Sequence, residues 1–98
     1  MQFSVKVGSY QNNTTLNICD TELLGKKIEQ DELTMNISEN YYGEKFVDTE
    51  EAKSLLENSS IINMVGSKTI SLSIEIGVCS EKGIKMISGI PFLIVFKI

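Results

Sequence analysis

The sequence predicts an α+β fold: a single small domain over residues 1–98, with a mixed or antiparallel sheet and two to three short helices. Three observations support this prediction. Several segments alternate apolar and polar residues with the period of a β-strand. One segment has the side-chain chemistry of a helix start. The chain has 98 residues, 42% of them hydrophobic and 22% charged, which suits one globular domain.

The N-terminal segment predicts a β-hairpin. Phe3, Val5 and Val7 alternate with polar residues, and the alternation resumes at Leu16 and Ile18. We therefore expect strands over residues 2–7 and 14–19, joined by a loop longer than a two-residue turn.

The next part of the chain predicts a short helical turn over residues 20–25, capped by Asp20 and closed by Gly25 with a positive φ. The elements expected after it are a polar connection over 26–32, a strand over 33–37, a turn over 38–43 and an extended piece over 44–47.

The clearest local signal lies at residues 48–51. Asp48 is placed to cap a helix, and Glu51 is placed to reach back to the cap residue. The apolar face that follows consists of Ala52, Leu55 and Leu56. The pattern predicts a helix that ends near Asn58.

The second half of the chain contains one ambiguous segment. Residues 61–65 read as a buried strand. Residues 67–76 alternate in the manner of a strand, yet Gly66 and Gly77 flank them in the manner of helix boundaries. Both readings stay open from the local pattern, and propensity favours the strand.

The C-terminal segment predicts two strands. A turn over 80–83 precedes strands over 84–87 and 91–98, which Ser88 and Gly89 connect. The run 92–96 shows no alternation, which is typical of a central strand buried on both faces.

The composition excludes several kinds of chemistry. All nine basic residues are Lys, and Arg, His and Trp are absent. Without His the chain has no imidazole base and no histidine metal ligand. Two cysteines, Cys19 and Cys79, are too few for a four-ligand zinc site. We expect no metal and no cofactor.

Charge and hydropathy restrict the setting. A net charge of −4 argues against direct binding of nucleic acid. No apolar stretch approaches the ~20 residues that span a membrane, and the N-terminus lacks the apolar centre of a signal peptide. We therefore expect a cytoplasmic protein without a membrane contact.

The segment Gly66-Ser67-Lys68 is a candidate anion site. If a helix begins at Ser67, its free amides and the charge of Lys68 favour an anion. The alternative is an ordinary serine cap, and it is the more frequent case.

Cys19, Asp20 and Lys26 form a second candidate. A thiol at a helix start with a lysine nearby is a candidate nucleophile. The alternative is a buried core cysteine.

Tyr42 and Asn63 are isolated candidates. Tyr42 could anchor an interface or pack in the core. Asn63 lies in an apolar stretch, so it is either a hydrogen-bonded buried amide or a site residue.

Several segments resemble an uncharacterised archaeal family, domain of unknown function 424. The matching segments, in order and at matching spacing, are residues 18–26, 38–43, 62–66 and 89–91. The resemblance implies a cytosolic archaeal protein with an α+β fold and a helix over 67–76, although this chain carries Ser and Ile where relatives carry Ala and Glu. It implies no activity and suggests the translation apparatus as a partner class.

Two classes of function follow. The first is a non-enzymatic module that binds a protein partner. The alternative is a small enzyme or an anion- or nucleotide-binding sensor that uses Cys19 and the segment 66–68. A homodimer is a further alternative if the C-terminal strand lies at a sheet edge.

Overall fold

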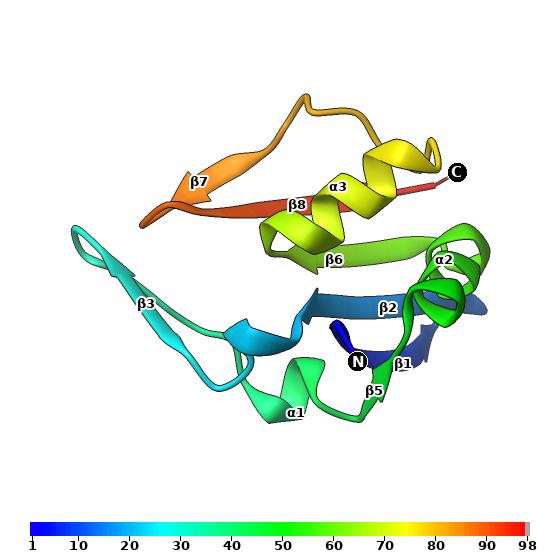
Figure 1. Ribbon diagram of the computed structural model, residues 1–98, viewed down its shortest axis with the longest axis horizontal. Coiled ribbons are helices and arrows are strands. Elements are labelled where there is room, and N and C mark those ends of the chain that lie inside the picture. The colour runs from blue at the N-terminus through cyan, green and yellow to red at the C-terminus, as the bar shows by residue number, and fades with distance from the viewer. Residues whose placement is uncertain (98) are drawn as a thin grey trace.

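The computed structural model describes residues 1–97 and shows a six-stranded sheet with two helices on one face and a small hairpin at one end (Figure 1). The elements in chain order are β1 (Phe3–Tyr10), β2 (Asn13–Asp20), the 3₁₀ turn η1 (Thr21–Leu23), β3 (Lys27–Gln30), β4 (Leu33–Asn36), α1 (Glu39–Tyr42), β5 (Lys45–Val47), α2 (Thr49–Asn58), β6 (Ile61–Val65), α3 (Ser67–Glu75), β7 (Lys85–Ile87) and β8 (Ile90–Phe96).

The main sheet is mixed. Its strand order is β5-β1-β2-β6-β8-β7, with β2 and β6 parallel and the other neighbours antiparallel. The strands β3 and β4 form a separate two-stranded sheet. The predicted α+β class, with a mixed sheet and short helices, is confirmed.

The N-terminal hairpin is confirmed, but its expected long loop is wrong. β1 and β2 pair from Phe3 with Asp20 to Tyr10 with Asn13, so only Gln11 and Asn12 remain in the turn. Both turn residues have positive φ angles, 49° and 68°. A tight turn of this hand matches the twist of the flanking strands.

The polar connection expected over residues 26–32 is instead the strand β3 and its turn. Ile28 is 4% exposed, and the rest of β3 is polar and exposed. One buried side chain leaves too little alternation to detect from the sequence. Asp31, with φ 56°, forms the turn into β4.

The predicted helical turn after β2 is the 3₁₀ turn η1, and Gly25 has the expected positive φ, 87°. The Asp20 side chain makes no capping hydrogen bond to η1, so that part of the prediction is wrong. The turn expected over 38–43 contains the single helical turn α1, whose Tyr41 amide donates to Ser38 Oγ at 3.3 Å.

Helix α2 begins as predicted, because the amide of Glu51 donates to Asp48 Oδ1 at 2.9 Å. The expected return contact of Glu51 is replaced by an ion pair. Its carboxylate lies 2.6 Å from Lys45 Nζ on β5. The cap residue therefore sets the start of α2, and Glu51 ties the helix to the neighbouring strand.

The ambiguous segment 67–76 forms helix α3, as the family resemblance implied and against the local alternation. Its C-terminus is closed by Gly77, with φ 78°. The amides of Gly77 and Val78 donate to the carbonyls of Ile74 and Ser73, at 3.0 and 2.9 Å. This is the hydrogen-bond pattern of a glycine-closed helix end.

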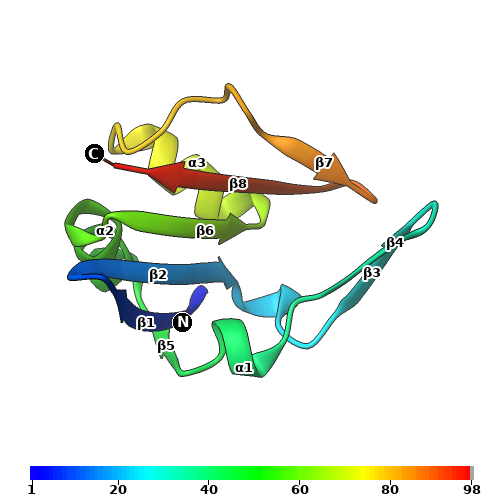
Figure 2. The ribbon, with the colours of Figure 1, turned by 180° about the vertical axis from the view of Figure 1, so that it is seen from behind.

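The last strand does not have the expected burial. β8 lies between β6 and β7, so an edge position gives no reason for a homodimer. Ile94 is 57% exposed and Phe96 67% exposed, because α2 and α3 cover only the opposite face of the sheet (Figure 2).

The apolar side chains gather in two cores. The larger core lies between the sheet and the helices α2 and α3 and contains Phe3, Val5, Leu16, Ile18, Val47, Ala52, Leu56, Ile62, Met64, Ile70, Leu72 and Leu93. The smaller core lies at the other face, under the β3–β4 hairpin, and contains Cys19, Ile28, Ile37, Val65 and Ile87.

Candidate functional site

The N-terminus of α3 is bound by a carboxylate of the same chain. Asp20 ends β2 and is 3% exposed. Its Oδ2 accepts from the Lys68 amide at 3.1 Å, and its Oδ1 accepts from the Thr69 amide and hydroxyl, both at 2.8 Å. Free helix amides favour an anion, and Asp20 supplies that anion across 48 residues of chain.

This arrangement corrects the prediction of a serine cap. Gly66 occupies the cap position, with φ 110°, and Ser67 is an exposed first residue of the helix. An external anion at the amides of residues 68 and 69 would have to displace Asp20. The anion-binding hypothesis for Gly66, Ser67 and Lys68 therefore lacks free donors at these two amides.

Gly66 is required by the close approach of Asp20. A Cβ atom at this position would lie 2.4 Å from the Cγ of Asp20, far inside van der Waals contact. The positive φ also disfavours any other residue.

The ammonium group of Lys68 forms an ion pair at the surface. Its Nζ lies 3.1 Å from the carboxylate of Glu22, and both side chains are about half exposed. The pKa of Glu22 lies below its ordinary value, because the carboxylate is hydrogen-bonded to its own backbone amide and to Lys68. Lys26 is exposed on the connection between η1 and β3.

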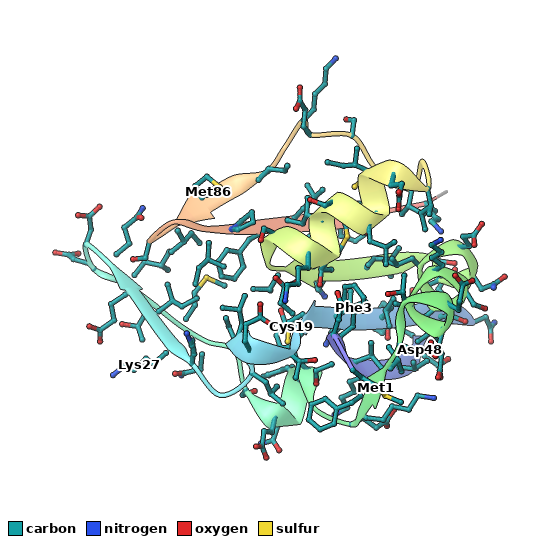
Figure 3. The ribbon with its side chains drawn as sticks, in the orientation of Figure 1. Met1, Phe3, Cys19, Lys27, Asp48 and Met86 are labelled. Atoms are coloured by element: carbon teal, nitrogen blue, oxygen red, sulfur yellow. The ribbon has the colours of Figure 1, made fainter. Side chains whose placement is uncertain are left out.

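Cys19 is a core residue. It is fully buried in the smaller core, opposite Ser4 of β1 and Val65 of β6. Figure 3 shows its side chain in the interior, whereas Lys27 and Met86 stand at the margin. Burial, followed by the nearby carboxylates of Asp20 and Glu22, raises the pKa of the thiol to about 12. The thiolate is the reactive species, so the structure argues against a nucleophilic Cys19.

We expect Cys19 to resist thiol reagents in the folded protein. Its pKa rises from 9.0 to about 12, which lowers the thiolate fraction at pH 8 by about a thousandfold. The measurement is labelling with Ellman's reagent in a Cys79→Ala variant, which leaves Cys19 as the only thiol. Labelling is expected in urea and not in buffer. Rapid labelling of the folded variant would restore the reactive-thiol hypothesis.

Tyr42 and Asn63 lie together at a groove of about 460 Å³ between the β3–β4 hairpin and the sheet. The lining residues are Leu33, Met35, Tyr42, Asn63, Met64, Val65, Gly83, Lys85, Ile87, Phe92, Leu93 and Ile94. They come from β4, α1, β6, β7, β8 and the loop before β7. Burial raises the pKa of the Tyr42 hydroxyl to about 12, so this group is neutral.

The sheet register explains the order of side chains on this face. Directly paired residues on adjacent strands point to the same face. One row across the sheet consists of Lys6, Asn17, Asn63 and Ile94. Within it, Asn63 Nδ2 donates to Asn17 Oδ1 at 2.9 Å. The next row on the same face, two residues along each strand, contains Cys19, Val65 and Phe92 and lies in the smaller core.

The family assignment rests on a match to the profile of "Protein of unknown function (DUF424)" over residues 8–98. The chain belongs to the DUF424 family.

The fold of this DUF424 chain is also similar to a crystal structure of an uncharacterized conserved protein from Methanopyrus kandleri. The TM-score is 0.79 at 22% sequence identity, and the match covers 98% of this chain and 93% of the other. None of the curated proteins compared with the chain matches it.

In this DUF424 chain the predicted site residues fall into separate places. Asp20, Gly66, Ser67 and Lys68 meet at the start of α3. Tyr42 and Asn63 meet at the groove, while Lys26 belongs to neither place. Sequence reasoning missed Asn17, Leu33, Met35, Lys85 and Ile94. The unbroken apolar run at 92–96 contains Ile94, but its pattern predicts a strand buried on both faces.

Two further findings concern the described residues alone. Over residues 1–97, no helix is long and apolar enough to cross a membrane. In the same part of the chain, no three His, Cys, Asp or Glu side chains come together in a way that could hold a metal ion.

Proposed function

We propose that this DUF424 chain is a non-enzymatic protein-interaction module that holds an apolar segment of another protein in the groove between β4 and β8. The observation that carries the proposal is apolar surface left open beside a preformed hollow. Leu33 is 47% exposed and Ile94 57% exposed, on opposite sides of the groove. Exposed apolar patches next to a groove are typical of protein-binding surfaces.

The surroundings of the groove also favour binding over catalysis. The lining residues with polar side chains are Asn63, Tyr42, whose hydroxyl is neutral, and Lys85. General acid–base catalysis needs a group that titrates near neutral pH. The Cys19 thiol, which the sequence offers as a candidate nucleophile, is buried in the smaller core.

The test is photo-crosslinking from the two sides of the groove. A photoreactive benzoylphenylalanine is placed at Leu33 or at Ile94, with Glu57 on α2 as the control position on the helix-covered face. We expect the two groove positions to capture the same apolar segment of one protein in an archaeal host, and position 57 not to capture it. An additional Ile94→Asp replacement should reduce capture from Leu33 at least tenfold.

Other outcomes would contradict the proposal. If positions 33 and 94 capture no shared segment, the groove is not a protein-binding site. If both capture this same chain, the occupant is a second copy and the module is a homodimer.

A captured ribosomal protein or translation factor would support the translation apparatus as the partner class and the cytosol as the setting.

A further inference from the structure

Asn17 and Asn63 form an amide pair in which one carbonyl oxygen and one NH2 group make no hydrogen bond within residues 1–97. Asn63 Nδ2 donates to Asn17 Oδ1 at 2.9 Å, and both side chains are half-buried. This leaves Asn63 Oδ1 and the Asn17 amide hydrogens without a partner among the hydrogen bonds of residues 1–97. If the O and N atoms of both side-chain amides are exchanged, one carbonyl oxygen and one NH2 group are again left unpaired. The pair therefore offers one acceptor oxygen and one donor NH2 group on adjacent strands.

An extended peptide is complementary to such a pair. Each residue of an extended chain carries one N–H and one C=O, which can pair with an acceptor and a donor that lie side by side. Main-chain hydrogen bonds of this kind are a recurring way of binding peptides, with side-chain pockets adding specificity. The pockets here are apolar: Leu33 and Met35 on one wall, Phe92 and Ile94 on the other.

The charge of the groove is opposite to that of the chain. The lining residues include Lys85 and no Asp or Glu, although the chain as a whole has a net charge of −4. Lys85 takes part in none of the ion pairs found over residues 1–97. Lys6, at the far end of the asparagine row, lies outside the groove lining, and its Nζ donates to the Asn40 carbonyl at 2.7 Å. A carboxylate on the occupant would complement Lys85.

We infer that the groove binds an extended apolar peptide segment that carries one Asp or Glu. Its backbone pairs with Asn63 of the lining and with the neighbouring Asn17 on β2, and its carboxylate pairs with Lys85. The inference rests on the proposed function and names the chemistry of the partner.

The first test selects random twelve-residue peptides, displayed on phage, for binding to the full chain, and then measures the affinity of the selected peptides by calorimetry. We expect the selected peptides to share an apolar run with one acidic residue. Lys85→Glu should weaken their binding at least tenfold, and a peptide with Lys in place of its acid should regain affinity for Lys85→Glu. Lys82→Glu, an exposed lysine outside the groove lining, is the matched control and should change affinity less than twofold.

The second test removes peptide N–H groups one at a time by N-methylation. We expect one position to lose at least tenfold in affinity, and this loss to shrink in an Asn63→Leu variant that lacks the acceptor. If the Asn63→Leu variant does not fold, the test with Lys85→Glu still decides the inference.

The outcomes separate the two proposals. Peptides that Ile94→Asp weakens, but that show no acidic preference and no response to Lys85→Glu, would overturn this inference and leave the protein-binding groove in place. If no recovered peptide is weakened by Ile94→Asp, both proposals fail.

Discussion

Replacing Asp20 with alanine is expected to lower the free energy of unfolding by about 3 kcal/mol. The carboxylate accepts three hydrogen bonds at the start of α3, from the amides of Lys68 and Thr69 and from the Thr69 hydroxyl. Asp20 and Thr69 are buried, so water cannot readily replace the lost acceptor. The measurement is urea unfolding followed by circular dichroism.

The matched control for Asp20→Ala is Glu22→Ala. Glu22 also carries a carboxylate at this end of α3, but it is exposed and its ion pair with Lys68 lies at the surface. An exposed ion pair contributes about 0–1 kcal/mol. Equal effects of the two replacements would show that the buried hydrogen bonds of Asp20 do not stabilise the helix.

Replacing Gly66 with alanine is expected to cost about 3 kcal/mol or more in the free energy of unfolding. The new Cβ would lie 2.4 Å from Asp20 Cγ and 2.5 Å from its Oδ1. Asp20 cannot retreat without losing its bonds to the helix, and the φ of 110° is itself unfavourable for alanine. The same urea titration measures the effect.

Gly25→Ala is the control for backbone strain. Gly25 has φ 87°, and an added Cβ would meet no atom within 4 Å. Its replacement should therefore cost only the strain of a left-handed residue, about 1–2 kcal/mol. If Gly66→Ala costs no more than Gly25→Ala, the contact with Asp20 does not determine the glycine.

The two positions are also expected to be coupled. In an Asp20→Ala background the carboxylate that collides with the new Cβ is gone, so Gly66→Ala should cost at least 1 kcal/mol less than in the natural sequence. Additive effects would mean that residues 20 and 66 act independently.

Asp20 and Gly66 belong to two of the segments that carry the family resemblance. Residues 18–26 contain the candidate thiol Cys19, and residues 62–66 end at Gly66, the first residue of the candidate anion site. In the structure Asp20 and Gly66 lie against each other at the start of α3, next to the ends of the paired strands β2 and β6. The groove that Tyr42 and Asn63 line is the place where we propose that a partner binds.

The sequence by itself determined the elements whose signals are local. The hairpin of β1 and β2 follows from the alternation of apolar and polar residues around Val5 and Ile18. Helix α2 follows from Asp48, whose carboxylate accepts a hydrogen bond from an amide only three residues later. In both cases the interacting residues are neighbours along the chain or repeat with the period of one element.

The tertiary structure decided what depends on distant residues. The strand-like alternation of α3 is overridden by a cap from Asp20, which lies 49 residues before Thr69. The hairpin strand β3 is held against the main sheet by the burial of Ile28 and by Ser88, whose amide and hydroxyl donate to the Gln30 side chain and the Glu29 carbonyl. The groove is assembled from residues between Leu33 and Ile94. No local pattern carries these features, because a buried carboxylate, a covering hairpin and an open sheet face exist only once the strands have paired.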